Sequence, residues 1–366
     1  MGVLKGIEEL DWGQWEHAYG PATDVPGLLQ ELLEEESAED AQYELYGNII
    51  HQGTVYPATK HAIPWLIKLL VPESTADRVW LLQYLLDLAW GDSYMRLHAH
   101  LDDDGSPEYA SRMAQEVSHV DGVRAAVVDG FEVYLALFDF ENVSEVGAAI
   151  DLIVGVPELL ERLQKDAWAK FEALLAHSDA RVRTKATMGL GWFQSWEGMS
   201  DYIDRASTDE SEAVRWAAAW ASGYHRLHTQ EVVDRLVHAM LEPQALDDEL
   251  EAVLERSVGQ ASIAPLLSAP EEFHPHILEG MTVQLQRAKA IEATEAARLM
   301  LLMVFGQERA PESFEELSSR QVEVLRLVSE CDEAWVFDGN MSQLLSSWGL
   351  PSRRDALKTY VNQKDD

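Results

Sequence analysis

The sequence predicts an all-α protein, an α-solenoid in which helical hairpins stack in one continuous superhelical array. Three observations support this prediction. Apolar residues recur with the 3.6-residue period of a helix almost throughout, and no segment of comparable length alternates with the period of a strand. Residues that start helices recur at intervals, with proline and glycine between them. A set of small and aliphatic positions also repeats at a pitch in the thirties.

The predicted helices are about 10–15 residues long and are joined by short turns. The first carries one apolar stripe, formed by Val25, Leu28, Leu29, Leu32 and Leu33. Later helices follow N-cap residues such as Ser178-Asp179. Helices of this length with short connections favour helical hairpins over a single large bundle.

Four sets of positions at i, i+4 and i+8 lie in the middle of the chain. They are Val146/Ile150/Val154, Val182/Ala186/Leu190, Val214/Ala218/Ser222 and Leu250/Leu254/Val258. Successive sets start 36, 32 and 36 residues apart. Because such a pitch is typical of two-helix solenoid repeats, we expect each hairpin to bury its apolar face against its neighbours.

Two of these sets carry a family resemblance. The segments Asp179–Ala186 and Glu212–Ala218 resemble the first helix of HEAT repeats, whose pattern is an acidic residue, then Val-Arg, then Ala. The stretch His51–Leu66 and the ending Gly339–Pro351 are similar to segments of uncharacterised bacterial HEAT-repeat proteins. The resemblance implies HEAT-like hairpins over about two thirds of the chain.

The predicted organisation has four parts. Residues 1–90 are N-terminal HEAT-like repeats, 91–140 an irregular helical insertion with an acidic loop at 101–107, 141–300 the central HEAT-like repeats, and 301–366 a C-terminal helical capping unit.

The composition limits the classes of partner. With 64 Asp and Glu against 28 Lys and Arg, the formal net charge is −36. This excess repels phosphate backbones and anionic lipids, so direct binding of nucleic acid or membrane is disfavoured and a basic protein is the favoured partner. There is no signal-peptide core, no apolar run of membrane-spanning length and only one cysteine, so we expect a cytoplasmic protein.

Candidate catalytic and metal-ligating groups are few. Histidines pair at His98/His100, His225/His228 and His274/His276, without a carboxylate at a matching ligand spacing. HEAT-type iron hydroxylases depend on repeated His-Glu dipeptides, which this sequence lacks. There is no Gly-x-Ser-x-Gly elbow and no phosphate loop, and acidic neighbours disfavour a thiolate at Cys331. We therefore expect no metal, no cofactor and no catalytic residue.

The twelve tryptophans are the first candidate recognition residues. Trp192/Trp196 and Trp216/Trp220 are i, i+4 pairs, so each pair forms a ridge on one side of a helix. Two interpretations are open: the ridges are the core between repeats, or they line a binding groove together with Trp65.

The polar segment between two helical stretches, His51–Tyr56, is a second candidate. A tight turn at Gly53 would present His51, Gln52, Thr54 and Tyr56 at a hairpin tip or concave edge. Alternatively, His51 and Tyr56 cap the helices on either side.

The third candidate is acidic. The first fifty residues contain a single basic residue, Lys5, and the run Glu34, Glu35 and Glu36. This run is either a solvated face or a docking surface for a basic protein.

Together these features predict a non-enzymatic protein-binding scaffold or adaptor with a strongly acidic solenoid surface. One alternative is an immunity or inhibitor protein that masks a basic toxin or nuclease. The other is a metal-dependent or hydrolytic enzyme on a HEAT-like scaffold, using His51 or the His225/His228 pair.

Overall fold

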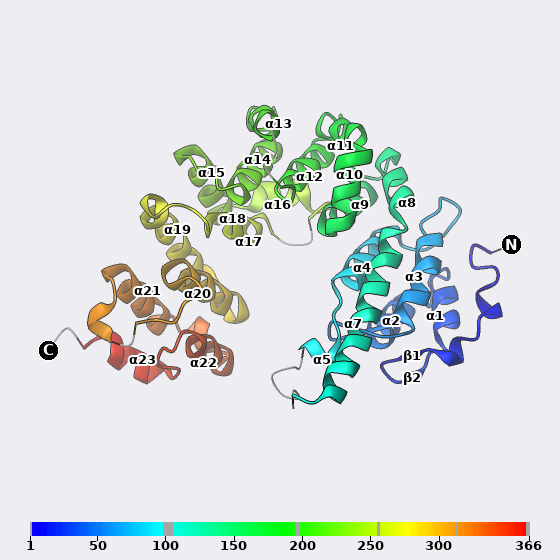
Figure 1. Cartoon of the computed structure of the whole chain (residues 1–366). Helices are drawn as coiled ribbons and strands as arrows, with labels where there is room; N and C mark the ends of the chain where they lie inside the picture. Colours follow the sequence, from blue (N-terminus) through cyan, green and yellow to red (C-terminus); the bar gives the residue numbers. More distant parts are fainter. Residues whose placement is uncertain (1, 98–104, 195–197, 255–256, 312, 364–366) are drawn as a thin grey trace. The chain divides into compact units, whose positions relative to one another are not determined.

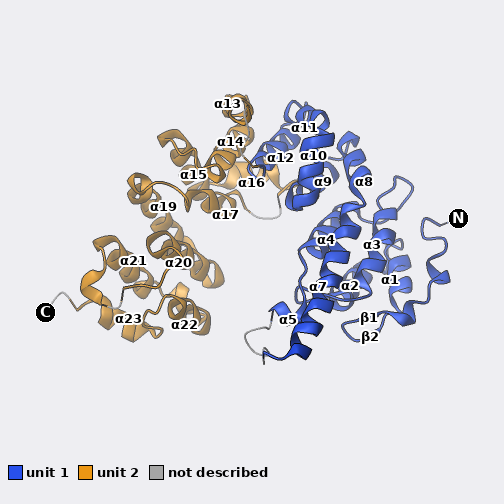
Figure 2. Ribbon diagram, viewed as in Figure 1, with its two compact units in different colours: residues 1–193 blue, residues 194–366 orange. Residues whose placement is uncertain are grey.

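The computed structural model describes residues 2–97, 105–194, 198–254, 257–311 and 313–363. Helices dominate these ranges, and the only regular strands in them form two short hairpins (Figure 1). The predicted all-α solenoid of helical hairpins is confirmed. The chain divides into two compact units, Met1–Phe193 and Gln194–Asp366 (Figure 2).

The first unit consists mainly of helices. They are α1 (Val25–Glu31), α2 (Ala38–Asn48), α3 (Thr59–Lys68), α4 (Arg78–Trp90), α5 (Tyr94–Leu97), α7 (Pro107–Val128), α8 (Phe131–Ala136), α9 (Val143–Gly155), α10 (Pro157–Asp166), α11 (Trp168–Leu175) and α12 (Ala180–Leu190). Its strands pair antiparallel as β1 (Glu16–His17) with β2 (Gly20–Pro21) and β3 (Ile50–His51) with β4 (Thr54–Val55). Short 3₁₀ turns lie at Ile7–Glu9, Trp12–Gln14 and Leu137–Asp139.

Packing in the first unit centres on α4, which contacts α7 and α9. Tyr84 of α4 is fully buried, and its hydroxyl donates to the Leu45 carbonyl of α2 at 2.8 Å. Burial of the aromatic ring is favourable, and the buried hydroxyl keeps a hydrogen-bond partner. The segment 91–140 contains α7, a regular helix of 22 residues that packs on α3 and α4. The four-part division itself stays a prediction, and residues 101–104 of the predicted acidic loop lie outside the described residues.

The second unit is also built from helices. They are α13 (Met199–Ser207), α14 (Glu212–Tyr224), α15 (Gln230–Leu241), α16 (Gln244–Leu250), α17 (Val258–Ala261), α18 (Ile263–Leu266), α19 (His274–Arg287), α20 (Ala290–Phe305), α21 (Ser319–Glu330), α22 (Asp338–Ser347) and α23 (Arg354–Val361). Short 3₁₀ turns lie at Glu271–Phe273, Phe314–Glu316 and Glu333–Trp335.

Three of the four predicted repeat sets lie in helices, namely α9, α12 and α14. As predicted, Val182, Ala186, Val214 and Ala218 are at most 1% exposed. The fourth set, at Leu250, Leu254 and Val258, was wrongly expected to form one helix. Here α16 ends at Leu250 and a separate helix, α17, starts at Val258 behind the N-cap Ser257. The Val258 N–H also donates to Asp247 Oδ1 at 2.6 Å, which fixes the chain in a turn rather than a continued helix.

Candidate functional site

The polar segment His51–Tyr56 forms a β-hairpin. Gln52 and Gly53 have φ of 50° and 82°, so both central residues of the turn are left-handed, as tight two-residue hairpins require. A third segment holds the hairpin in place, because Val55 N–H donates to the Asp92 carbonyl at 3.0 Å and Asp92 N–H to the Gly53 carbonyl at 2.8 Å. The turn is therefore rigid and paired on one side.

The four candidate residues of this hairpin differ in exposure. Gln52 is exposed at the tip, and His51 and Tyr56 are half-buried. Thr54 is only 4% exposed, so the expectation that it is presented for binding is wrong. The cause is the third segment, since Thr54 pairs with Asp92 in a parallel bridge and is covered by it.

A second hairpin places another aromatic beside His51. The ring of Tyr19, between β1 and β2, meets the His51 ring edge-on with centroids 5.8 Å apart. Burial raises the pKa of Tyr56, and the neighbouring ionisable groups of Tyr19, Glu116 and Tyr94 raise it further. Helices α5 and α7, which carry Tyr94 and Glu116, both contact β4, so these groups lie near the same hairpin. We call Tyr19, His51, Gln52, Tyr56 and Tyr94 the tyrosine patch.

Two members of the patch, Tyr19 and Tyr94, were not among the sequence candidates. They are 71% and 49% exposed, which is uncommon for aromatic side chains of this size. The available signal was their position next to turns, in Tyr19-Gly20-Pro21 and shortly after Gly91. Tyr19 lies on a hairpin and Tyr94 begins helix α5. Exposed tyrosines on ordered elements offer contact area at low conformational cost, as binding surfaces commonly do.

A partly buried polar network fixes the hairpin that carries Tyr19. The Tyr19 N–H donates to His17 Nδ1 at 3.0 Å, and His17 Nε2 donates to Asp24 Oδ1 at 2.9 Å. Asn48 Nδ2 donates to the other oxygen, Asp24 Oδ2, at 2.7 Å. Because Asn48 is the last residue of α2, two residues before β3 begins, the two hairpins are anchored to the same carboxylate. The imidazole of His17 is thereby held in one tautomer and serves to support the patch.

The tryptophan candidates fall into two groups. Trp216 and Trp220 are 0% and 5% exposed, and their indole N–H groups donate to Ser262 Oγ at 2.9 Å and the Ala261 carbonyl at 3.0 Å. They belong to the core, so the binding-groove interpretation is wrong for this pair. Trp192 is 51% exposed, and Trp196 lies outside the described residues.

Trp65 is also buried, at 9% exposed, and its ring lies under the Lys68 ammonium at 3.7 Å. The ring thus makes a cation–π contact with a lysine of the same helix. The expectation that Trp65 lines a binding groove is therefore wrong as well.

The acidic candidates lie in the turn between α1 and α2. Glu34, Glu35 and Glu36 are all exposed, and none forms an ion pair with another residue in the described ranges. Their backbone holds the turn, because the Glu34 carbonyl accepts from Ser37 N–H at 3.1 Å. The side chains themselves are left to solvent.

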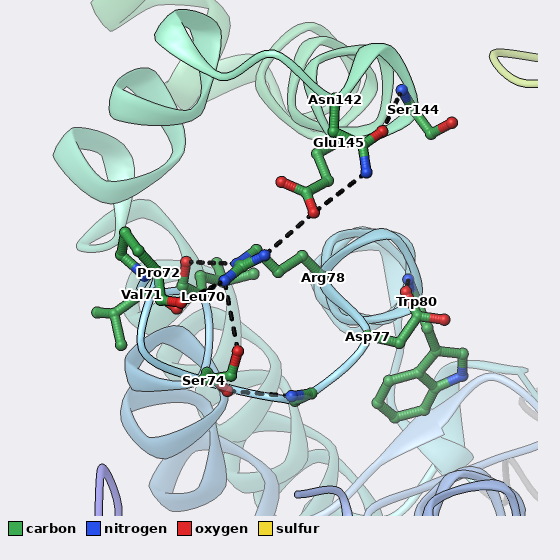
Figure 3. Close-up of polar contacts among 11 residues, drawn as sticks. Leu70, Val71, Pro72, Ser74, Asp77, Arg78, Trp80, Asn142, Ser144 and Glu145 are labelled. Carbon is green, nitrogen blue, oxygen red and sulfur yellow. Dashed lines mark hydrogen bonds and ion pairs between the residues drawn. The ribbon is translucent and has the colours of Figure 1, made fainter. Parts of the chain in front are cut away.

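Several arginine side chains bond to backbone carbonyls and carboxylates of the chain itself. The guanidinium of Arg78 donates through Nη2 to the carbonyls of Val71 and Pro72 at 3.0 and 3.1 Å, and through Nη1 to Glu145 Oε1 at 3.1 Å (Figure 3). These carbonyls lie in the loop that connects α3 to α4. Arg78 thus closes a turn and pairs with a carboxylate of α9.

Arg183 and Arg215 repeat this arrangement in the HEAT-like helices. Each donates through Nη1 to the carbonyls five and six residues earlier, at distances between 2.6 and 3.2 Å. The Val-Arg pair of the sequence pattern therefore has a physical role. The valine enters the core and the arginine braces the turn before its helix.

The histidine pairs make structural contacts. His228 Nε2 bonds to the Pro265 carbonyl and His274 Nε2 to the Ala269 carbonyl, both at 2.9 Å, while His276 Nε2 lies 3.1 Å from Asp234 Oδ1. His98 and His100 lie outside the described residues. Within the described residues, no three His, Cys, Asp or Glu side chains cluster closely enough to hold a metal ion. In the same ranges, no helix is both long and apolar enough to cross a membrane.

Comparison with known proteins identifies the repeat type. Residues 169–255 match the family model for HEAT repeats, a range that begins in α11 and includes α12 to α16. A solved structure, the crystal structure of an engineered protein from the Northeast Structural Genomics Consortium, aligns over 93% of this chain and 94% of its own, at 16% identity and a TM-score of 0.33. No curated protein matches the sequence. The chain is thus a helical protein that carries HEAT repeats over residues 169–255.

Proposed function

We propose that this protein is a non-enzymatic, cytoplasmic protein-binding scaffold whose acidic surface recruits a basic protein. HEAT repeats generally serve as protein-interaction scaffolds, which supports the class of function. The histidine pairs give the enzyme alternative no support: His228 bonds to a backbone carbonyl, His274 to a backbone carbonyl and to Arg320, and His276 to Asp234.

The observation that carries the proposal is that several arginines are bonded within the fold, whereas the acidic run faces solvent without a basic partner in the described residues. Arg78, Arg183 and Arg215 bond to carbonyls of their own chain, whereas Glu34–Glu36 have no basic partner among the described residues and face solvent. The arginines are therefore less available to outside partners than their number suggests. An excess of exposed carboxylates attracts cationic surfaces and accelerates their association.

A basic toxin or nuclease is one specific form that such a partner could take. The immunity-protein alternative therefore belongs to the same proposal and differs only in the identity of the captured protein. Direct binding of nucleic acid is not expected for a chain of net charge −36.

The test is affinity capture from native cytoplasm, followed by association kinetics with the captured protein at different salt concentrations. We expect a basic partner whose on-rate falls about tenfold or more between low and physiological salt, because exposed charges are screened over about 8–10 Å there. Reversing Glu34, Glu35 and Glu36 to Lys should lower the on-rate further. The matched control reverses Glu158, Glu161 and Asp166, which are exposed on α10. An acidic partner, or an on-rate that does not change with salt, would contradict the proposal.

A further inference from the structure

Helix α4 of the first unit is accessible along one side, whereas its other side packs into the core through buried leucines. Trp80, Gln83, Asp87 and Trp90 are three or four residues apart, so they lie on the same side of the helix. Trp80 and Gln83 are half-buried, whereas Asp87 and Trp90 are exposed. We call these four side chains, together with Tyr46 of α2, the α4 face. The stripe from Trp80 to Trp90 is about 15 Å long.

The rings at the start of the α4 face rest on a buried ring. Trp80 stacks on Tyr84, with ring centroids 4.7 Å apart and an interplanar angle of 19°. Tyr46, which is 38% exposed, lies 4.6 Å from the Tyr84 ring and meets the Trp80 ring edge-on at 6.0 Å. Because Tyr84 is fully buried and its hydroxyl is bonded to a carbonyl of α2, the two outer rings are held in fixed positions.

The tryptophan at the other end of the α4 face is also held in place. Nε1 of Trp90 donates to the Gly155 carbonyl of α9 at 3.0 Å, yet the side chain is 59% exposed. An exposed indole that is already fixed loses little conformational freedom when a partner binds, so more of the contact energy appears as affinity. The α4 face is therefore preorganised for contact with another molecule.

Two carboxylates adjoin these rings. Asp87 Oδ2 accepts a hydrogen bond from the Tyr46 hydroxyl at 2.5 Å, and Asp77, the N-cap of α4, accepts from the Trp80 N–H at 3.1 Å (Figure 3). Both aspartates are exposed, and neither forms an ion pair with a residue of the described ranges. Their negative charges are therefore available to a cation from outside.

Helices α2 and α4 contain little positive charge of their own. Their acidic residues, all exposed, are Glu39, Asp40, Glu44 and Asp87. Their one Lys or Arg is Arg78, whose guanidinium is bonded to carbonyls and a carboxylate within the fold. A surface of fixed rings and uncompensated carboxylates is complementary to a cationic side chain. It favours arginine over lysine, because a guanidinium can stack on a ring and donate to a carboxylate at the same time.

We propose that the α4 face binds an extended, arginine-containing segment of the basic partner. One guanidinium packs on the accessible rings of Tyr46 and Trp80 and donates to Asp87, and the segment runs along α4 to Trp90. A span of about 15 Å corresponds to about five residues of extended chain. The inference rests on the proposed function, because it assigns a segment of the proposed basic partner to one site.

The probe for the test is a fluorescent peptide of about eight residues in which arginine alternates with serine, which is long enough to cover the α4 face. The control peptide has lysine at every arginine position and therefore the same charge. In fluorescence anisotropy at low salt, we expect the arginine peptide to bind the full chain about threefold or more tightly than the lysine peptide. Equal affinities would indicate attraction to charge alone and would overturn the proposal.

Matched variants locate the binding site. Asp87→Asn removes a charge but keeps an acceptor for the Tyr46 hydroxyl, and it should weaken the arginine peptide about threefold or more because a charge-assisted hydrogen bond is lost. The control, Asp166→Asn, makes the same change at an exposed position on α10. Equal affinities of these two variants would contradict the assignment.

Substitutions of Trp80 test the contact with the ring. Trp80→Leu keeps an apolar side chain over Tyr84 but removes the aromatic face, so it should weaken the arginine peptide about threefold or more. Trp80→Phe keeps an aromatic ring and should bind more tightly than Trp80→Leu. Equal binding by wild-type protein and Trp80→Leu would exclude the stacked guanidinium.

Nitrogen-15 labelling of tryptophan in the unaltered protein gives a readout that does not depend on the stability of variants. The indole N–H signals of Trp80 and Trp90 should shift when the arginine peptide is added, and those of the buried Trp216 and Trp220 should not. Spectra of Trp80→Phe and Trp90→Phe assign the two signals. Binding that leaves both signals unshifted would overturn the inference.

The two proposals fail in different ways. If the captured cytoplasmic partner binds wild-type protein, Asp87→Asn and Trp80→Leu equally well, the assignment to the α4 face is wrong and the scaffold function stands. If no partner is captured but the arginine peptide binds and shifts the Trp80 and Trp90 signals, the α4 face binds arginine and the proposed function is wrong.

Discussion

Arg78 and Glu145 form an ion pair of 3.1 Å that joins α4 to α9, with side chains that are only 15% and 12% exposed (Figure 3). The pair is part of a larger network, because the same guanidinium also bonds to backbone carbonyls after α3. One arginine therefore holds three segments of the first unit together, namely the end of α3, α4 and α9. A charge pair so far removed from water depends on both partners being present.

We expect Arg78→Met to lower the free energy of unfolding by about 3–5 kcal/mol, because it leaves Glu145 charged and unpaired in a nearly buried position. Urea unfolding measures the change. The control is Lys170→Met, which breaks an exposed ion pair with Asp139 and should lower stability by about 1 kcal/mol or less. Similar losses in the two variants would show that the Arg78 network has no special role.

Ala218→Asp should destabilise the second unit by several kcal/mol. Ala218 is fully buried in α14, so the new carboxylate would be placed in a packed interface and removed from solvent. Ala114→Asp makes the same change on the exposed face of α7 and should lower stability by about 1 kcal/mol or less. Thermal melting followed by circular dichroism distinguishes them, and a stable Ala218→Asp protein would contradict the repeat packing described for α14.

The N-cap carboxylate of α12 should make stability depend on pH. The hydrogen bond from the Arg181 side chain is the main cause that lowers the pKa of Asp179 from 3.8 to about 2. A lowered pKa in the folded state stabilises the protein above pH about 4, and this contribution is lost as the pH falls toward about 2.

Asp179→Asn tests this dependence, because the amide keeps the cap but removes the charge. We expect wild-type protein to be more stable by about 0.5–1 kcal/mol at neutral pH, since Asp179 is a partly exposed group, and the difference should vanish at pH about 2. Arg181→Met should abolish the same pH dependence in otherwise wild-type protein. A difference that stays constant across this range would argue against the ion pair.

The tyrosine patch should determine how long the captured partner stays bound. Tyr19→Ala removes a side chain that is 71% exposed, so the fold should persist while the off-rate rises about tenfold or more, with little change in salt dependence. Tyr43→Ala, at a residue that is 78% exposed on α2 and outside the patch, is the matched control. Surface plasmon resonance with the captured partner measures both rates, and equal off-rates for the two variants would exclude the patch from the interface.

Trp216→Ala gives the contrast expected of a core residue. It should lower the free energy of unfolding by about 3–5 kcal/mol, because a fully buried indole and its hydrogen bond to Ser262 are lost. Below its melting temperature, the off-rate should be unchanged.

Much of the fold could be predicted from local sequence. The sets around Val182 and Val214 combine an acidic start, an apolar i, i+4, i+8 stripe and a steady pitch, and each of these signals acts within one helix or one hairpin. The same is true of the turn at Gln52-Gly53, where glycine accepts the left-handed conformation without a steric penalty. The break at Leu250 was missed because it depends on the contact between Asp247 and the Val258 N–H, which no periodicity contains.

Side-chain exposure is what only the tertiary structure decided. An i, i+4 pair of tryptophans forms the same ridge whether it faces a neighbouring helix or water, and it was the packing of Ser262 and Ala261 against Trp216 and Trp220 that made this ridge core. Thr54 is buried because Asp92, 38 residues later, pairs with its strand. The sequence by itself thus determined the helices, their repeat and the charge, since these depend on neighbours along the chain. The tyrosine patch depends on segments that meet only when the chain is folded.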